Sequence, residues 1–454
     1  MSVVGTAVIA LIMFCAAIGA VASIRDPDNG LGKEFLEGLH SIGHIFIPVA
    51  GIMAAIPLLS QFVGSVFGPV LNYVGADPAI AATSLIAVDM GGYQLAHHLA
   101  ESRESWIMSM MVGYMAGATI VFSIPVGLAM VDKKDHKYLA LGVLSGILSV
   151  PVGVLISSVI IVLTDPFVRA SPTTQGASGI QLNLEFATVG LNLVPLIAFV
   201  GMIAIGLRLF PNAMIRGFMV FGRLLDAAIK LILAGCIIEY FTEVFSNTVG
   251  WHFDPIIADE QDRFRALEVA GYIGIMLAGA FPMVFLIRKY LEKPVNRLGE
   301  MAGLEGAGAA GILASLANIL AMFRLVREMR PQDKVINIAF AVCAAFLFGD
   351  HLSFTANFQP NLIPAVMIGK LAGGIFAVLL AYRLSVPQAL ELSRHYSLRD
   401  SGVLPARQAA RRLVAGKAAG VPRGPLPTAT TRGGGPAGTR RGHAGRSPEL
   451  TPAR

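Results

Sequence analysis

The chain alternates between long apolar blocks and short loops that carry its charges. A helix needs about 20 apolar residues to cross the hydrocarbon core of a bilayer. Blocks of that kind predict nine spanning helices, at residues 3–21, 44–72, 106–131, 138–164, 182–207, 217–245, 266–287, 335–357 and 361–382. We therefore expect an all-α polytopic membrane protein, embedded in a lipid bilayer.

Two further apolar stretches do not fit as simple crossings. Residues 303–323 are rich in small side chains and lie between basic clusters at 288–297 and 324–334, so a single crossing would place one cluster outside. Residues 78–100 contain an acid followed by two glycines. Non-helical backbone at membrane depth is tolerated only against protein or a water-filled cavity. The pattern predicts two re-entrant hairpins that line a polar cavity.

The basic loops predict the orientation of these helices. Short loops rich in Lys and Arg face the cytoplasm. Four loops qualify, and they hold Lys133, Lys134 and Lys137; Arg208 and Arg216; Arg288, Lys289, Lys293 and Arg297; and Arg324, Arg327, Arg330 and Lys334. The 246–265 loop is acidic and suits the outer face. We expect the N-terminus outside and the C-terminus in the cytoplasm.

The composition also indicates a membrane protein, and the distribution of charged residues explains the positive net charge. Of the 454 residues, 55% are hydrophobic and 14% are charged, whereas soluble domains carry roughly 25% charge, so a soluble enzyme is excluded. Taken alone, the formal charge of +6 would point to a nucleic-acid partner. Nine Arg, one Lys and one Glu after residue 400 contribute +9, however, which leaves −3 for the rest. We expect residues 383–454 to form a basic, disordered cytoplasmic tail and no nucleic acid to bind.

The cysteines and histidines indicate no metal site and no cofactor. Cys15, Cys236 and Cys343 lie in separate apolar stretches, and none is spaced for metal ligation. His97 and His98 stand beside Glu101 and Arg103, and no further metal ligands converge with them in the sequence.

Two parts of the chain resemble each other. The shared features are Pro57 with Pro69 against Pro282 with Pro294, and the glycine strings 142–146 against 369–373. The predicted parts are an N-terminal helix and loop (1–43), a first repeat (44–164), linking helices (165–265), a second repeat (266–382) and the tail (383–454). The orientation above gives the repeats opposite senses. Inverted repeats with broken helices are typical of transporters that bind substrate where the repeats meet.

An acid at membrane depth is a functional candidate, because burying a charge there is costly. Asp89 precedes Gly91 and Gly92, which allow the helix to break. A carboxylate beside freed backbone groups could hold an ammonium. The alternative is that Asp89 caps the N-terminus of a half-helix and accepts its amide protons.

Other polar residues of the predicted spans allow two interpretations each. Asp350 could orient His351 or move a proton with it, or it could form an ion pair at the end of its span. Asn318 could contact a ligand or bridge two helices. Thr119 and Ser123 are expected to bond to their own helix backbone rather than to a ligand.

Several ordered strings resemble the ethanolamine permease of bacterial ethanolamine-utilisation operons, the EutH family, over about residues 40–385. They are Asp89-Met90-Gly91-Gly92, residues 117–125 and 137–144, Leu316-Ala317-Asn318 and Gly349-Asp350-His351-Leu352. Ile319 and Ala321 depart from the family, which typically has a second Asn and a Pro there. The resemblance implies a permease, not an enzyme, that takes ethanolamine across the inner membrane.

Ethanolamine is a small cation with one hydroxyl group, so a carboxylate with polar neighbours could hold it. The candidate substrate-binding residues are Asp89, Gly91, Gly92, Tyr93, Thr119, Ser123, Asn318, Asp350 and His351. Among them, Tyr93 could add a cation–π contact. Facilitated diffusion and proton coupling both stay open, as does an oligomer.

Two competing functions are weighed against transport. An intramembrane aspartyl protease could use Asp89 and Asp350. A Gly-x-Gly-Asp pattern is typical of such proteases, however, and here Leu347 replaces its first glycine. An ion channel lacks support, because the sequence has no repeated carbonyl-filter string.

Overall fold

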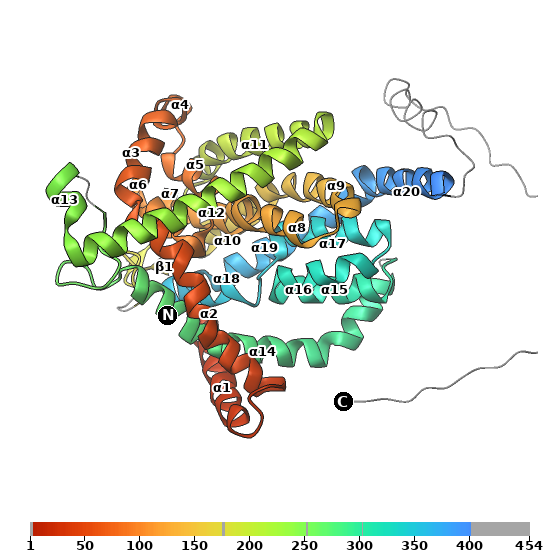
Figure 1. Ribbon diagram of the computed structural model, residues 1–454, viewed down its shortest axis with the longest axis horizontal. Coiled ribbons are helices and arrows are strands. Elements are labelled where there is room, and N and C mark those ends of the chain that lie inside the picture. Colours follow the sequence, from red (N-terminus) through yellow and green to blue (C-terminus); the bar gives the residue numbers. More distant parts are fainter. Residues whose placement is uncertain (1–2, 175–177, 251–252, 302, 401–454) are drawn as a thin grey trace, which may run out of the picture. The chain divides into compact units, whose positions relative to one another are not determined.

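The structure is a computed structural model that describes residues 3–174, 178–250, 253–301 and 303–400. These ranges are almost entirely helical (Figure 1), which confirms the all-α class. The described strands are β1 (Phe167–Val168) and β2 (Ile180–Gln181), a short antiparallel pair. The disordered tail predicted over 383–454 is wrong for its first part, because Val386–Asp400 form the helix α20. Residues 401–454 of the predicted tail lie outside the described residues. The helices pack against one another within the compact unit Met1–Arg394.

Within the described residues, seven helical segments are long and apolar enough to cross a membrane. They are Val3–Arg25 (α1), Gly30–Ala54 (α2), Arg103–Met130, Lys133–Thr164, Phe186–Leu209 (α11), Ala266–Met301 (α14) and Pro360–Leu384. The third comprises α7 (Arg103–Val112), a π-helix (Gly113–Ser123) and α8 (Ile124–Met130); the fourth contains α9 (His136–Ile147) and α10 (Val150–Thr164); the last contains α19 (Ile363–Leu384). The remaining short elements include α13 (Val244–Val249) and α20 (Val386–Asp400).

The apolar block predicted as one span over 44–72 is divided in the structure. The helix α2 begins earlier, at Gly30, and ends at Ala54. Two shorter helices follow, α3 (Ile56–Val66) and α4 (Gly68–Tyr73), and each has a proline in its first turn. Proline has no amide hydrogen to donate and therefore starts helices more readily than it continues them. Pro57 and Pro69 thus mark where the two shorter helices begin, whereas Pro48 lies inside α2.

Two other predicted spans do not form uninterrupted apolar helices. Residues 217–245 fall in α12 (Pro211–Thr242), which carries charged side chains. Residues 335–357 divide into α17 (Pro331–Ala344) and α18 (Asp350–Phe358). The segment between them contains Phe346 at φ +60°, a conformation that a helix does not allow.

Residues 78–100 turn back on themselves as a first hairpin. Its legs are α5 (Pro78–Leu85) and α6 (Gly92–Leu99), joined through the short helix Val88–Met90. The Asp77 carboxylate accepts hydrogen bonds from the amide of Ala79 at 2.9 Å and from the amide of Glu101 at 2.9 Å. One side chain therefore holds the two ends of this hairpin together.

Residues 303–330 form a second hairpin, whose legs are α15 (Gly306–Ala317) and α16 (Ile319–Leu325). Its base is closed by an ion pair between Arg330 and Glu305 at 3.1 Å. At its tip, the amide of Phe346 donates to the carbonyl of Ser315 at 3.0 Å. The hairpin therefore runs along α17 from the start of that helix to its broken end, and Figure 1 shows α15 and α16 beside α17.

The matched glycine strings lie where helices of the two proposed repeats touch. A side chain at Gly142 of α9 would collide with Ile338 of α17, and one at Gly369 of α19 would collide with Ser157 of α10. Small residues let helices approach closely inside a membrane. Each string therefore packs against the other half of the chain.

Candidate functional site

Asp89 lies at the tip of the first hairpin, where the helix is broken as predicted. Gly91 has φ +91°, and a Cβ there would lie 2.8 Å from the side chain of Ile52. Glycine therefore suits both the conformation and the space. Gly91 is also the N-cap residue of α6, so Asp89 does not occupy the capping position. Asp89 keeps partial exposure in the interior of the helical unit, and its carboxylate is not used to end a helix.

Asp350 is the first residue of α18, beside the tip of the second hairpin. It is partly exposed, and within the described residues it forms no ion pair, so the alternative of an ion pair at the span end is not seen. His351 is buried against the rings of Tyr114 and Phe346, with ring centroids 4.7 Å and 5.3 Å away. Its Nδ1 atom has no hydrogen-bond partner among the described residues. Asp350 therefore does not orient the imidazole in this structure.

Lys370 is the charged residue that the sequence reasoning missed. Its side chain lies in α19, is 1% exposed, and donates from Nζ to the carbonyl of Tyr114 at 3.0 Å. Lys370 interacts electrostatically with Asp89, and Asp89 does so with Asp350. A lone lysine in the apolar stretch 361–382 is a functional candidate for the same reason as an acid. The sequence alone therefore marks Lys370 as a candidate site residue.

Tyr114, whose carbonyl accepts the hydrogen bond from Lys370, lies in a π-helix. Residues 113–123 adopt this looser winding, and π-helical turns occur frequently at functional sites. The Tyr114 carbonyl accepts from Lys370, and its hydroxyl shares a hydrogen bond with Thr355 of α18 at 2.6 Å. One residue of the π-helix thereby ties α18 and α19 together beside the two acids.

When Asp89, Asp350 and Lys370 are all ionised, their charges sum to one negative unit. Asp89 and Asp350 contribute two carboxylates, and Lys370 contributes one ammonium. A buried charge is stable only when it is paired.

Thr119 and Ser123 bond to backbone carbonyls. The Thr119 hydroxyl contacts the carbonyl of Met115 at 2.7 Å and that of Val342 at 3.0 Å, and Ser123 donates to the carbonyl of Ala118 at 3.2 Å. These bonds match the expectation that both hydroxyls serve the backbone. Val342 lies in the last turn of α17, where carbonyls have no helical partner. Thr119 thus supports the break before Asp350 instead of facing a ligand.

Asn318 and Tyr93 also have structural partners. The side-chain oxygen of Asn318 accepts from the amide of Leu320 at 2.8 Å and caps α16, so it does not bridge helices. Tyr93 is fully buried, its ring stacks on Trp106 at 4.8 Å, and its hydroxyl accepts from Gln359 at 2.8 Å. Because Trp106 covers the ring, this arrangement gives no support to a cation–π contact at Tyr93.

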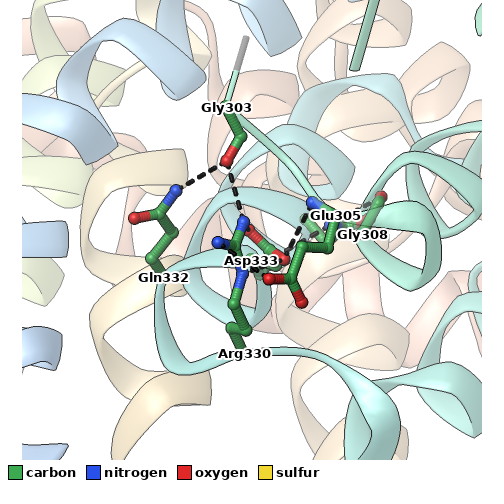
Figure 2. Close-up of polar contacts among 7 residues, drawn as sticks. Gly303, Glu305, Gly308, Arg330, Gln332 and Asp333 are labelled. Carbon is green, nitrogen blue, oxygen red and sulfur yellow. Dashed lines mark hydrogen bonds and ion pairs between the residues drawn. The ribbon is translucent and has the colours of Figure 1, made fainter. Parts of the chain in front are cut away.

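The base of the second hairpin is fixed by a dense polar network (Figure 2). Asp333 is fully buried and accepts from Arg330 at 3.1 Å and from the amide of Glu305 at 3.2 Å. Arg330 and Gln332 both donate to the carbonyl of Gly303 at 2.9 Å. The hydrogen bond to Asp333 raises the pKa of Arg330, so the guanidinium stays charged. The start of α17 is thereby bonded to the start of α15.

Comparison of the sequence with known proteins identifies the family. The sequence profile described as "Ethanolamine utilisation protein, EutH" matches residues 4–384. The chain belongs to the EutH family. A relative from Listeria monocytogenes, named "Probable ethanolamine permease EutH", is 37% identical over 82% of this chain and 91% of its own length. The Escherichia coli relative of the same name is 37% identical over 78% and 86%.

A further relative has no assigned function in its name. The uncharacterized protein YxeR of Bacillus subtilis is 32% identical over 82% of this chain and 92% of its own length. No solved structure matches the chain. The names of the EutH relatives and the seven apolar helices agree on a multi-pass membrane protein of the transporter class.

Proposed function

We propose that this EutH-family protein is an inner-membrane permease that carries ethanolamine into the cytoplasm. The observation that carries this proposal is the interior cluster of Asp89, Asp350 and Lys370, whose net charge of one negative unit matches one ammonium. The relatives named as probable ethanolamine permeases supply the identity of the cation. Partial exposure of both acids provides access for a small solute.

We propose nine crossings and two re-entrant hairpins. The crossings are the seven apolar segments together with α12 and the broken helix α17–α18. Lys334 pairs with Asp135 at 2.7 Å, so two of the basic loops lie together, as a common cytoplasmic side requires. This topology places the C-terminal tail in the cytoplasm.

The inverted repeat is supported by reciprocal packing. The glycine string of each half contacts the other half, at Ile338 and Ser157. The bases of the hairpins also differ in their surroundings, since the second lies with the basic loops and the first lies near the acidic loop. Each hairpin would then open the site to one side of the membrane, which is the basis of alternating access.

The mechanism begins with replacement of water at Asp89 and Asp350 by the ammonium of ethanolamine. Lys370 remains on the Tyr114 carbonyl and keeps the empty site from carrying two unbalanced negative charges. Facilitated diffusion needs nothing more than movement of the hairpin tips. Proton coupling would need a protonatable group that changes partner, and His351 lacks a bond to Asp350. Uptake that persists after the pH gradient collapses would assign facilitated diffusion.

The intramembrane protease remains the competing function. An aspartyl protease uses two carboxylates that share one proton. Here Lys370 interacts electrostatically with Asp89, and such a pair of carboxylates has no use for a lysine. The permease names of the relatives also favour transport.

We propose that two copies of the chain associate through α12. Arg223, Asp226 and Lys230 are exposed on this helix, and the Lys230–Asp226 pair has an N–O distance of 2.7 Å. Close contact of Gly222 with Pro125 of α8 and of Gly51 with Ile229 places the charged stretch beside apolar helices. Charged side chains are costly in lipid. A second copy offers both signs of charge and would cover them.

The decisive experiment is uptake of labelled ethanolamine into proteoliposomes. Replacing Asp89 by Asn keeps the shape and removes the charge, so we expect saturable uptake to fall at least tenfold, because a neutral amide binds an ammonium poorly. The Asp132→Asn variant is the matched control, since Asp132 is exposed in a loop, and it should transport normally. Unchanged uptake by Asp89→Asn would exclude a role for this carboxylate.

A further inference from the structure

A second polar site lies at the far end of the first hairpin. A pocket of about 330 Å³ opens there between α6, the 171–173 segment and the loop that precedes α14. Its lining includes Gln94, His97, His98, Asp254, Asp262 and Phe264. None of these residues belongs to the central cluster of Asp89, Asp350 and Lys370.

Gln94 indicates that the pocket is built to hold a ligand. Its side chain is 4% exposed and lines the pocket. Neither its Oε1 nor its Nε2 atom has a hydrogen-bond partner among the described residues. A buried amide without partners is unfavourable, because it has lost its water and gained nothing in return. A group that both donates and accepts, such as a hydroxyl, would satisfy it.

The charges of the pocket favour a cation. Arg265 pairs with Asp259 at 3.0 Å and lies 3.8 Å from Asp262. Backbone amides, with that of Asp262 foremost, lower the pKa of Asp259, so this acid stays ionised as the partner of Arg265. The Asp254 carboxylate forms no ion pair within the described part of the chain. Among the acids and Arg265, negative charge is therefore in excess.

The pocket is connected to the central site through a single helix. Gln94 lies in α6, which begins at Gly92, close to Asp89 at the tip of the hairpin. The other wall of the pocket belongs to the acidic loop on the side opposite the basic loops. A solute that approaches from that side would meet the pocket first.

We propose that this pocket is an outer binding site for an amino-alcohol cation. Asp254 binds the ammonium, and the Gln94 amide bonds with the hydroxyl. The choice of ethanolamine rests on the proposed permease function, whereas the pocket itself rests on the unpartnered amide and the excess acids. The outer site collects the cation before the hairpin admits it to Asp89.

The test compares transport from the two faces of the membrane. In right-side-out proteoliposomes, Asp254→Asn should raise the KM for labelled ethanolamine about fivefold and leave kcat nearly unchanged. In inside-out proteoliposomes the same variant should behave like the wild type. Gln94→Leu should give the same asymmetry. Glu260→Gln is the matched control, because Glu260 is an exposed acid of the same loop that does not line the pocket.

A binding experiment separates this inference from the proposed function. Purified protein with Asp89→Asn should still bind labelled ethanolamine, and the added change Asp254→Asn should abolish that binding. Equal binding by the single and double variants, or an unchanged external KM, would overturn the outer site. If the wild type transports no ethanolamine but Asp89→Asn retains binding that depends on Asp254, the permease proposal fails and the pocket stands.

Discussion

At the scale of single residues, the chemistry depends on which charges share the interior. Asp89 and Asp350 could be found in the sequence, since each is an acid in an apolar stretch. Lys370 adds a basic group to them, because it interacts electrostatically with Asp89. A site with two unbalanced carboxylates would hold a cation too tightly for release.

Lys370→Met tests this balance directly. Removing the ammonium leaves two acids for one cation, so we expect the KM for ethanolamine to fall about tenfold, equivalent to ~1.4 kcal/mol. We also expect kcat to fall, because release becomes slower. Uptake kinetics in proteoliposomes measure both. Lys134→Met, which changes an exposed lysine, is the control. A KM equal to that of the wild type would show that Lys370 does not balance the site.

At the scale of elements, both hairpins are closed at the base by an aspartate that accepts a backbone amide from the opposite end. Asp77 does so for the first hairpin and Asp333 for the second. Each tip can then move relative to a fixed base.

Asp333→Asn should loosen the second hairpin. Arg330 would lose its buried anionic partner, and hydrogen bonds to charged groups contribute about 1.5–3 kcal/mol. We expect faster amide hydrogen exchange across α15 and a lower melting temperature. Glu305→Gln is the comparison variant, because Glu305 pairs with the same arginine from the surface. Surface ion pairs contribute about 1 kcal/mol or less, so its effect should be smaller. Equal effects of the two variants would contradict a special role for the buried acid.

At the scale of the whole molecule, α12 is a long helix that the fold leaves largely uncovered. Its 32 residues include two that are buried, Ile229 and Cys236. Self-complementary patches are typical of two-fold dimers, in which the same residues meet their counterparts. Arg223 and Lys230 flank Asp226 along the helix, so in two parallel copies the Asp226 of each can pair with a basic residue of the other.

Charge reversal tests this dimer in nanodiscs with two differently tagged copies. We expect wild-type copies to co-purify, Asp226→Arg copies not to do so, and Arg223→Asp/Lys230→Asp copies not to do so. A mixture of the two variants should co-purify, because opposite charges then face each other. If the mixture fails while each variant remains folded and transports ethanolamine, α12 is not the interface.

The sequence by itself determined the membrane class, most of the helices and the break at Asp89. These follow from local properties, since apolar blocks form spanning helices and glycine permits the turn at Gly91. It did not locate the ends of α2, because hydropathy does not mark where a helix begins and ends within an apolar block. The resemblance to the EutH family came from ordered strings that also lie within single elements.

Only the tertiary structure decided which of these residues meet. It placed Lys370 near Asp89, covered Tyr93 with Trp106 and turned the Thr119 hydroxyl toward Val342. Such contacts join segments far apart in the chain, and their geometry depends on how helices pack against one another. No local pattern encodes that packing. The sequence therefore provided the acids of the site, and the fold provided the cation that sets their net charge.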